Sequence, residues 1–291
     1  MKNTAVYTVE AFVAAPIVDT SLALEISFEA APDEKTLDAV KHKLEKLYGA
    51  SATVSVDGKN TEISKIPASV KQINARALAD YSKPRYNAAD AVRIISRLTD
   101  PDDGCPWDRA QTHESIRINL IEEAYEAVDA IDKHDEENMQ EEFGDVFLQS
   151  LLQSEISSRL GEFDFSDVCD GLCKKLISRH TWLFGGDTAS NAADALVLWD
   201  KAKATEKNYD SVKNQLQRLP DEFPALLRCQ KAHKKIKKSG ASVDPQAEFE
   251  SAIAARDYAA VIAAACALLA DEGKDAEVEL NKLIRSKIDA L

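Results

Sequence analysis

Residues 113–160 read HESIRINLIEEAYEAVDAIDKHDEENMQEEFGDVFLQSLLQSEISSRL, and this stretch decides the fold. Apolar residues recur every three or four positions over about 113–132 and again over about 136–160. That spacing places them on one face of an α-helix. The stretch therefore predicts two long helices, each with an apolar face on which a neighbour can pack.

Acidic residues border both apolar faces. On a wheel of about 100° per residue, Glu123 lies at the edge of the first face, Glu126 lies beside it, and Glu122 lies further toward solvent. Glu142 and Asp145 follow one border of the second face. Residues three apart stack on a helix, so each pair forms a two-carboxylate stripe, and antiparallel packing would make four carboxylates converge. The expected faces comprise Ile116, Leu120, Ala124, Ala127 or Val128, and Ile131 in the first helix, and Gly144, Phe147, Leu148, Leu151 and Leu152 in the second.

Converging carboxylates require a cation. Two unscreened carboxylates 4 Å apart repel by about 4 kcal/mol at an effective dielectric constant near 20. Oxygen ligands with no histidine or thiolate nearby favour a hard ion, Mg²⁺ or Mn²⁺. The alternative is an acidic surface that only faces solvent. Gly144 favours the metal site, because a glycine inside a helix costs about 1 kcal/mol relative to alanine unless something approaches it closely.

The composition limits the partners. The 291 residues include 50 acidic and 36 basic side chains, and the net charge of −14 argues against nucleic acid or anionic lipid as a partner. No segment approaches about 18 uninterrupted apolar residues, which predicts a soluble, cytoplasmic protein with no membrane partner. The five cysteines are odd in number and lack Cys-x-x-Cys spacing, so reduced thiols are expected.

Two kinds of pattern divide the chain. Residues 22–28 and 54–56 alternate apolar with small or polar side chains, whereas DEKTLDAVKHKLEKLYG (33–49) has helical spacing. This predicts a small α+β domain ordered strand, strand, helix, hairpin. The linker SKPRYN (82–87) ends it, and Asn87 is expected to N-cap the first of many helices. The fold class is therefore mainly α, an all-α bundle with a small N-terminal α+β domain, and the expected domains are 1–82, 87–207 and 215–291.

Five segments carry a family resemblance. They are CPWDRAQTH (105–113), EEAYE (122–126), EEFGD (141–145), KKLISRH (174–180) and LWDKAK (198–203). In this order they closely resemble the MazG family of nucleoside triphosphate pyrophosphohydrolases, over roughly 87–291 and most strongly up to 207. The resemblance implies that 87–207 is a MazG-like, Mg²⁺-dependent catalytic domain. Such an enzyme cleaves NTPs or dNTPs between the α- and β-phosphates, giving a nucleoside monophosphate and pyrophosphate in nucleotide-pool housekeeping.

The same resemblance implies roles for particular residues. The metal ligands would be Glu123, Glu126, Glu142 and Asp145, while Glu122 would orient or deprotonate water. Lys175 and Arg179 would meet phosphates, and Trp107, Trp199 and Lys203 would contribute to the nucleotide site. Residue chemistry leaves alternatives open at three places. Trp107 could plug the end of the bundle while Asp108 caps the next helix, and Lys175 and Arg179 could complement a helix dipole. His113 could be a ligand or, as we expect, make a polar contact at a helix start.

The C-terminal region resembles a faded second half. LPDEFPALLRCQKAHKKIKKSG (219–240) and AEVELNKLIRSKI (276–288) match its ends, but FESAIAARDYAAVIAAACALL (249–269) between them lacks the acid pairs. Residues 215–291 are therefore expected to be a degenerate, shortened and inactive half. Its alanine-rich helix at 259–270 has few intrachain partners, which predicts a homodimer formed by the helical region. A further departure is RHTWLF (179–184), where Thr181 stands in place of the family's proline.

Two other functions compete with this one. The first is a narrower (d)NTPase or a phosphoribosyl-ATP pyrophosphohydrolase, because related all-α folds use similar acid clusters. The second is a regulatory or scaffolding protein that binds nucleotides and acts through a partner. The intact acids at 122–126 and 141–145 favour catalysis over binding alone.

Overall fold

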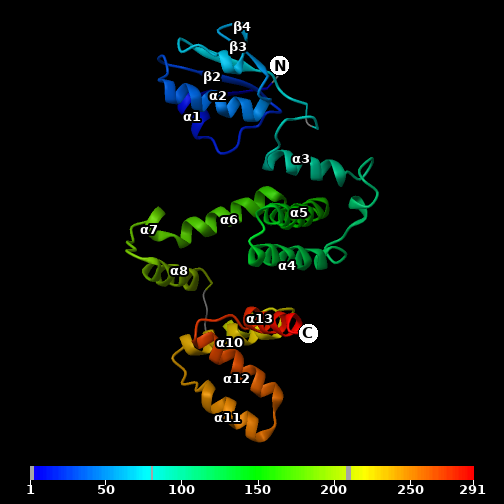
Figure 1. Ribbon diagram of the computed structural model, residues 1–291, viewed down its shortest axis with the longest axis vertical. Helices are drawn as coiled ribbons and strands as arrows, with labels where there is room; N and C mark the ends of the chain where they lie inside the picture. The colour runs from blue at the N-terminus through cyan, green and yellow to red at the C-terminus, as the bar shows by residue number, and fades with distance from the viewer. Residues whose placement is uncertain (1–2, 80, 208–210) are drawn as a thin grey trace. The chain divides into compact units, whose positions relative to one another are not determined.

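The computed structural model describes residues 3–79, 81–207 and 211–291. The chain divides into two compact units, Met1–Leu172 and Cys173–Leu291. Helices make up most of both, which confirms the mainly α class, and a small sheet lies near the N-terminus (Figure 1). The finer domain limits at 82/87 and 207/215 stay predictions.

The first unit begins with a five-stranded sheet. Its elements are β1 (Thr4–Thr8), α1 (Val9–Ala14), β2 (Ala23–Ser27), α2 (Glu34–Tyr48), β3 (Thr53–Val56), β4 (Lys59–Glu62), a 3₁₀ turn η1 (Ile63–Lys65) and β5 (Gln72–Ala75). The strand order is β1-β2-β5-β3-β4; β1 and β2 are parallel, and the other pairs are antiparallel. Figure 1 shows α1 and α2 on the same side of the sheet.

The expected order of strand, strand, helix, hairpin is incomplete. It missed α1, which starts where the Thr8 hydroxyl accepts a hydrogen bond from the Ala11 backbone and which buries Phe12 completely. It also missed β5, whose four residues bury only Ile73 and Ala75. Elements this short carry too few apolar positions to show a helical or strand period. Tertiary packing determines whether they form.

A single apolar core holds the sheet and its helices together. On α2 the buried residues Leu37, Val40, Leu44 and Tyr48 return at helical spacing, after Asp33 caps the helix. Alternate residues of the strands meet them, because successive side chains of a strand point to opposite faces. The core comprises Val9, Phe12, Val18, Leu24, Ile26, Phe28, Leu37, Val40, Leu44, Tyr48, Val54, Val56, Ile63, Ile66, Val70, Ile73 and Ala75.

Helix α3 (Ala88–Leu98) is tied to this sheet region by polar contacts. Asn87 N-caps it in a full capping box with Asp90, as expected, and its side-chain amide donates to the Val18 carbonyl. Arg93 pairs with Asp19 at 3.1 Å, and Lys83 forms a buried ion pair with Asp90. These contacts position the start of the helical region.

The central helix pair consists of α4 (Arg117–Lys133) and α5 (Glu136–Leu160), preceded by a 3₁₀ turn, η2 (Asp108–Ala110). The prediction for α5 is confirmed. Helix α4 starts four residues later than expected, because Thr112 and Ser115 bond each other's backbone in a turn. His134 ends α4 in a left-handed conformation, and Asp135 caps α5.

The two helices run antiparallel, since early residues of one contact late residues of the other. His113 ahead of α4 meets Gln153 and Ser157, whereas Glu123 meets Gln149. A second core forms along α3 and α5, from Ile95, Ile116, Leu151, Leu152 and Ile156. The carboxylates therefore face one another across an antiparallel pair.

The expected apolar face of α4 is only partly buried. Ile116 and Ala127 are buried, but Leu120, Val128 and Ile131 are between 40% and 48% exposed. Among the described residues α5 is the main packing partner of α4, so the rest of the face is uncovered within one chain. On α5, Leu151 and Leu152 are buried as expected, with Phe147 and Leu148 partly buried beside them.

Helix α6 (Phe165–Arg179) leads from the first unit into the second. There follow α7 (Thr181–Phe184), α8 (Ala192–Lys207), α9 (Val212–Gln217), α10 (Ala225–Lys238), α11 (Pro245–Ala255), α12 (Tyr258–Asp271) and α13 (Ala276–Asp289). Buried Gln230 joins the last helices: its amide donates to the carbonyls of Cys266 and Lys274 and accepts from the Ala276 backbone. Among the described helices, none is long and apolar enough to cross a membrane.

Candidate active site

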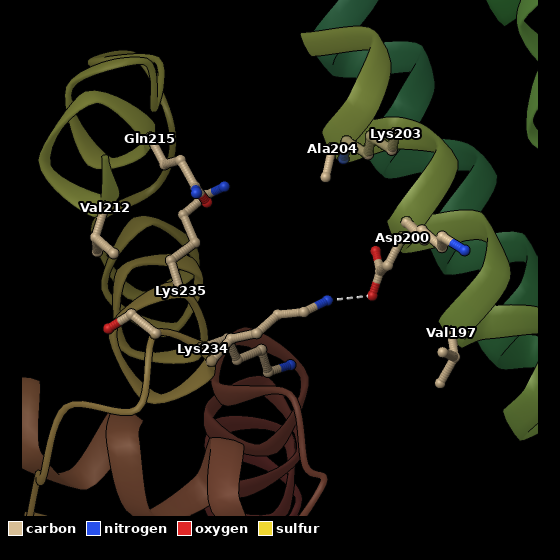
Figure 2. A pocket seen from close by; sticks show the side chains of 11 residues that line it. Val197, Asp200, Lys203, Ala204, Val212, Gln215, Lys234 and Lys235 are labelled. Atoms are coloured by element: carbon tan, nitrogen blue, oxygen red, sulfur yellow. Dashed lines mark hydrogen bonds and ion pairs between the residues drawn. The ribbon is translucent and has the colours of Figure 1, made fainter. Parts of the chain in front are cut away.

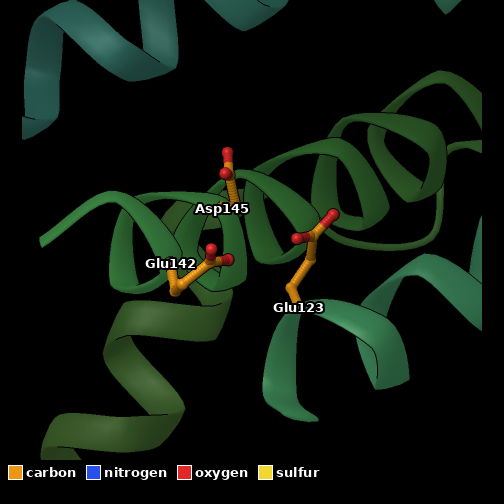
Figure 3. A group of neighbouring side chains, drawn as sticks. All are labelled: Glu123, Glu142 and Asp145. Atoms are coloured by element: carbon orange, nitrogen blue, oxygen red, sulfur yellow. The ribbon is translucent and has the colours of Figure 1, made fainter. Parts of the chain in front are cut away.

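Three acidic side chains meet across the central helix pair. Glu123 comes from α4, and Glu142 and Asp145 come from α5 (Figure 3). Each can offer a carboxylate oxygen within 4.8 Å of the other two. The spacing of three residues places Glu142 above Asp145 on one helix, and the antiparallel packing brings Glu123 opposite them.

The electrostatics of this cluster are unfavourable without a cation. Burial, together with the charges of Asp145 and Glu126, raises the pKa of Glu123. Burial and the charges of Glu126, Asp145 and Glu123 likewise raise the pKa of Glu142. Glu142 is 9% exposed, and one of its carboxylate oxygens is buried without a hydrogen-bond partner among the described residues. A buried carboxylate oxygen with no donor suits a metal ligand.

The other two predicted acids, Glu126 and Glu122, lie outside this group of three. Glu126 is exposed and lies outside the group of three, but its charge reaches both Glu123 and Glu142. Glu122 is exposed and accepts a long hydrogen bond of 3.4 Å from Asn119. Of the five expected acids, three are therefore brought together, and Glu126 acts on Glu123 and Glu142 through its charge. Glu122 accepts from Asn119 on its own helix and adds a smaller effect of its charge on Glu123.

The surroundings of Gly144 do not support the close approach that the sequence predicts for this glycine. It is exposed, and a Cβ placed on it would meet no described atom within 4 Å. No close approach within the described chain therefore explains this glycine.

Gln149 is a site residue that the sequence pattern did not reveal. It is 5% exposed, and its amide donates to Glu123 at 3.4 Å. Its position, one helical turn after Asp145, could have indicated it, because a polar residue inside an otherwise apolar face needs a partner. His113, four residues ahead of α4, contacts Gln153 and Ser157 in the second half of α5, so its polar contact links the two helices and does not cap a helix start.

The Cys-Pro-Trp-Asp turn presents its tryptophan to solvent. Trp107 is 59% exposed, so a plug at the end of the bundle does not fit. Asp108 begins the turn η2, and α4 starts without a side-chain cap, so the capping alternative is wrong as well. The loop is held by the Cys105 backbone bonded to Leu98 and by Arg109 bonded to the carbonyl of Asp102. A role for Trp107 in the nucleotide site stays a prediction.

The remaining predicted residues lie in the second unit. Arg179 is 6% exposed and forms a two-pronged pair with Glu206, at 2.9 and 3.0 Å. Its guanidinium lies 5.3 Å from the centre of the Trp199 ring, which also stacks edge-on against His180. Arg179 and Trp199 are thus brought together, and Glu206 engages the arginine. Lys175 is exposed on α6.

Lys203 lines a basic cavity of about 540 Å³. Figure 2 shows it on α8, with Lys234 and Lys235 on α10. Lys238 also lines the cavity and forms an ion pair with Asp200. Such a concentration of ammonium groups in a chain with a net charge of −14 suits an anionic group.

Comparison with known proteins decides what the acidic cluster belongs to. The pattern of the MazG nucleotide pyrophosphohydrolase domain matches residues 111–184. That segment contains all five acids together with Lys175 and Arg179. The chain belongs to the MazG family.

Individual proteins are similar to this chain. The nucleoside triphosphate pyrophosphohydrolase of Escherichia coli K12 is 35% identical over 149 residues, covering 51% of this chain and 57% of the relative. The MazG nucleoside triphosphate pyrophosphohydrolase/pyrophosphatase of Thermotoga maritima is 42% identical over 118 residues, 40% of this chain and 44% of that one. An uncharacterized 26.1 kDa protein from Streptomyces cacaoi is 33% identical over 168 residues, 57% of this chain and 67% of the other.

The matched region is a part of each protein. The chain spans little more than half the length of the Escherichia coli relative. Among solved structures, the mazG-related protein from Thermotoga maritima is 27% identical, with a TM-score of 0.35, covering 40% of this chain and 98% of that one. Divalent-metal dependence is general among MazG hydrolases, and the acidic cluster offers this MazG chain a place for such an ion.

Proposed function

We propose that this protein hydrolyses nucleoside triphosphates, ribo- or deoxyribo-, between the α- and β-phosphates. The products are a nucleoside monophosphate and pyrophosphate. The observation that supports the proposal is the carboxylate cluster of Glu123, Glu142 and Asp145 inside the segment that matches the MazG domain. Intact acids at ligand distance favour catalysis over nucleotide binding alone.

We assign Mg²⁺ as the metal, with Mn²⁺ as a substitute. Glu123, Glu126, Glu142 and Asp145 are the proposed ligands, because all-oxygen donor sets suit hard cations. The cluster fits such an ion on its own chemistry: two raised carboxyl pKa values and a buried oxygen without a partner are both relieved by a positive charge. When bound, the ion supplies charge neutralisation and a more acidic water.

Side chains of the protein are proposed to accept the proton and to contact the phosphates and the nucleotide. Glu122, the exposed acid beside the cluster, is proposed to accept a proton from the attacking water. Lys175 and Arg179 are proposed to meet the phosphates, and Trp107, Trp199 and Lys203 to contact the nucleotide. Arg179 reaches a phosphate only if Glu206 yields one of its two hydrogen bonds.

We propose in addition an assembly, a location and a limit on the partners of this protein. The protein forms a homodimer through its helical region, since exposed apolar side chains follow α4. It acts in the cytoplasm on the nucleotide pool. Nucleic acid is not a partner, because the net charge of −14 opposes a polyanion.

A panel of NTPs and dNTPs tests the reaction. Each would be incubated with Mg²⁺ or Mn²⁺, and pyrophosphate and orthophosphate would be measured separately. Pyrophosphate and monophosphate in equal amounts are expected. Orthophosphate as the sole primary product would mean that a different bond is attacked, and binding of nucleotide with no product would favour a regulatory role.

A further inference from the structure

A cavity of about 400 Å³ lies between the segment that follows α1, one face of α2 and the linker that leads to α3. Helix α2 contributes Ala39, His42, Lys43, Lys46 and Leu47, whose spacing of three and four residues places them on one face of the helix. The buried core residues of α2 lie on a different face. The cavity is far from the acidic cluster along the chain, and the proposed hydrolysis does not use it.

Polar contacts hold the walls of this cavity in place. The Lys43 ammonium donates to three backbone carbonyls at the end of α1, those of Phe12, Val13 and Ala15. On the linker, the Asn87 amide donates to the Val18 carbonyl. The Tyr86 hydroxyl accepts from the Lys83 backbone, which fixes the position of the ring. Because these contacts are internal to the chain, the cavity exists before a ligand arrives, and little loss of conformational freedom opposes binding.

Three more basic side chains line the cavity without an acidic partner. They are His42 and Lys46, one turn apart on α2, and Arg85 from the linker, and all three are exposed. In the described part of the chain none of them makes an ion pair or a side-chain hydrogen bond, and none of the residues that line the cavity is acidic. Nearby Lys83, by contrast, is buried against Asp90. Basic groups gathered without an acid favour an anion, and two fixed positive charges suit a phosphate monoester, which carries nearly two negative charges at pH 7.

Apolar side chains form most of the remaining lining. They include Val13, Ile17, Ala39 and Leu47. Ile17 is 49% exposed and Tyr86 is 45% exposed, so an apolar surface stands open beside the basic groups. Such a combination binds the organic body of a ligand and its charged group at the same time. We propose that this cavity binds a phosphate monoester with a flat apolar body, with Lys46 and Arg85 meeting the phosphate and with Ile17 and Tyr86 contacting the body.

Binding by the full chain tests this proposal. Calorimetric titrations would use phenyl phosphate, benzoate and inorganic phosphate, with EDTA present throughout to keep metal from the acidic cluster. Benzoate keeps the flat body and carries a single charge, whereas inorganic phosphate keeps the charge and lacks the body. Phenyl phosphate is expected to bind at least about tenfold more tightly than either of the others. No heat from phenyl phosphate at millimolar concentrations, or an equal affinity for benzoate, would overturn the proposal.

Variants of the lining locate the binding. Lys46→Gln and Arg85→Gln should each weaken phenyl phosphate binding about tenfold or more, because each removes a charge-assisted hydrogen bond, and Ile17→Ser should weaken it several-fold. Without ligand, the two charge variants should melt at the same temperature as wild type or higher, since repulsion among the basic groups is relieved. The matched controls are Lys35→Gln on α2 and Arg76→Gln, both exposed and outside the cavity.

Unchanged affinity in both charge variants, or an equal loss in the controls, would overturn the assignment of the cavity. Pyrophosphate release by every variant is expected to equal that of wild type and reports separately on the proposed hydrolysis. A failure of the hydrolysis assay therefore leaves the binding result intact, and a failure of binding leaves the hydrolysis intact.

Discussion

Gln149 donates a hydrogen bond to Glu123 from one helix of the central pair to the other, with 3.4 Å between the amide nitrogen and the carboxylate oxygen. The bond lowers the pKa of Glu123 against burial and the charges of Asp145 and Glu126, which raise it. It therefore favours the charged form of a carboxylate that is proposed to bind a cation.

Replacing Gln149 with methionine keeps the volume and removes the donor. The pKa of Glu123 should rise further, so the Mg²⁺ concentration that gives half-maximal rate should increase about tenfold or less. The acid limb of the pH–rate profile should move to higher pH, which a purely structural role would not produce. The matched control is Gln140→Met, an exposed glutamine on the same helix. An unchanged Mg²⁺ requirement would show that Gln149 does not position Glu123.

Replacing Glu126 with glutamine keeps the shape and removes one charge. If Glu126 binds the metal, the rate should fall by about two orders of magnitude, because a lost ligand removes several kcal/mol of transition-state stabilisation. The metal-free variant should melt at the same temperature or higher, since repulsion is relieved. Added Mg²⁺ should stabilise it less than wild type, because stabilisation follows RT ln(1 + [L]/Kd).

Thermal melts with and without millimolar Mg²⁺, alongside pyrophosphate release, check both halves of this expectation. Glu137→Gln, an exposed acid at the start of α5, is the control and should change neither. Wild-type turnover and an equal Mg²⁺-induced shift in Glu126→Gln would mean that this carboxylate is not a ligand.

The acidic cluster should make the metal-free protein sensitive to pH. The pKa values of Glu123 and Glu142 are raised above their ordinary value of 4.5 in the folded chain. The contribution of these two carboxyl groups to the stability of the folded protein is therefore complete below pH 4.5. It is lost as the pH rises through their raised pKa values. As the pH rises above 4.5, metal-free Glu142→Gln should therefore gain stability relative to wild type.

The measurement is the difference in melting temperature between the two proteins across that range, in EDTA. Taking the difference removes the titration of groups that both proteins share. Mg²⁺ should abolish the trend in wild type, because the bound ion replaces the protons. A difference that stays constant with pH would show that the carboxyls of the cluster do not interact.

Asp257 should matter for stability and not for catalysis. Its side chain caps α12 by accepting a hydrogen bond from the Ala260 backbone. Asp257→Asn should leave both turnover and melting temperature nearly unchanged, since asparagine caps as well. Asp257→Ala should cost about 1 kcal/mol of stability with turnover intact. A tenfold loss of rate in Asp257→Asn would show that the faded half takes part in the reaction.

The uncovered stripe on α4 should hold two copies together. It consists of Ile118, Ile121, Tyr125 and Val128, which are between 46% and 58% exposed and return at helical spacing. Light scattering of the full chain at micromolar concentration should give a dimer. Val128→Glu should shift it toward monomer, because burying a carboxylate in an apolar interface is costly. Val6→Glu, exposed on an edge strand, is the control. A monomeric wild type would contradict the homodimer.

Much of this protein is readable from the sequence because its decisive features are local. The limits of α5, the cap at Asn87 and the stacking of Glu142 on Asp145 all follow from the period of a helix and the chemistry of nearby residues. The order of the five motifs was specific enough to identify the family, and the match to 111–184 agrees with it.

Other features depend on how distant elements meet, which no local pattern contains. The rotation and register of α4 on α5 decide that Glu123 joins Glu142 and Asp145 more closely than Glu126 does. The same packing makes Gln149 part of the site and leaves Val128 exposed. Strand β5 forms because Ile73 is buried in the core that the sheet shares with α2. Its four residues do not predict a strand by themselves. Periodicity fixes neighbours on one element, whereas contacts between elements are set by the packing of the whole core.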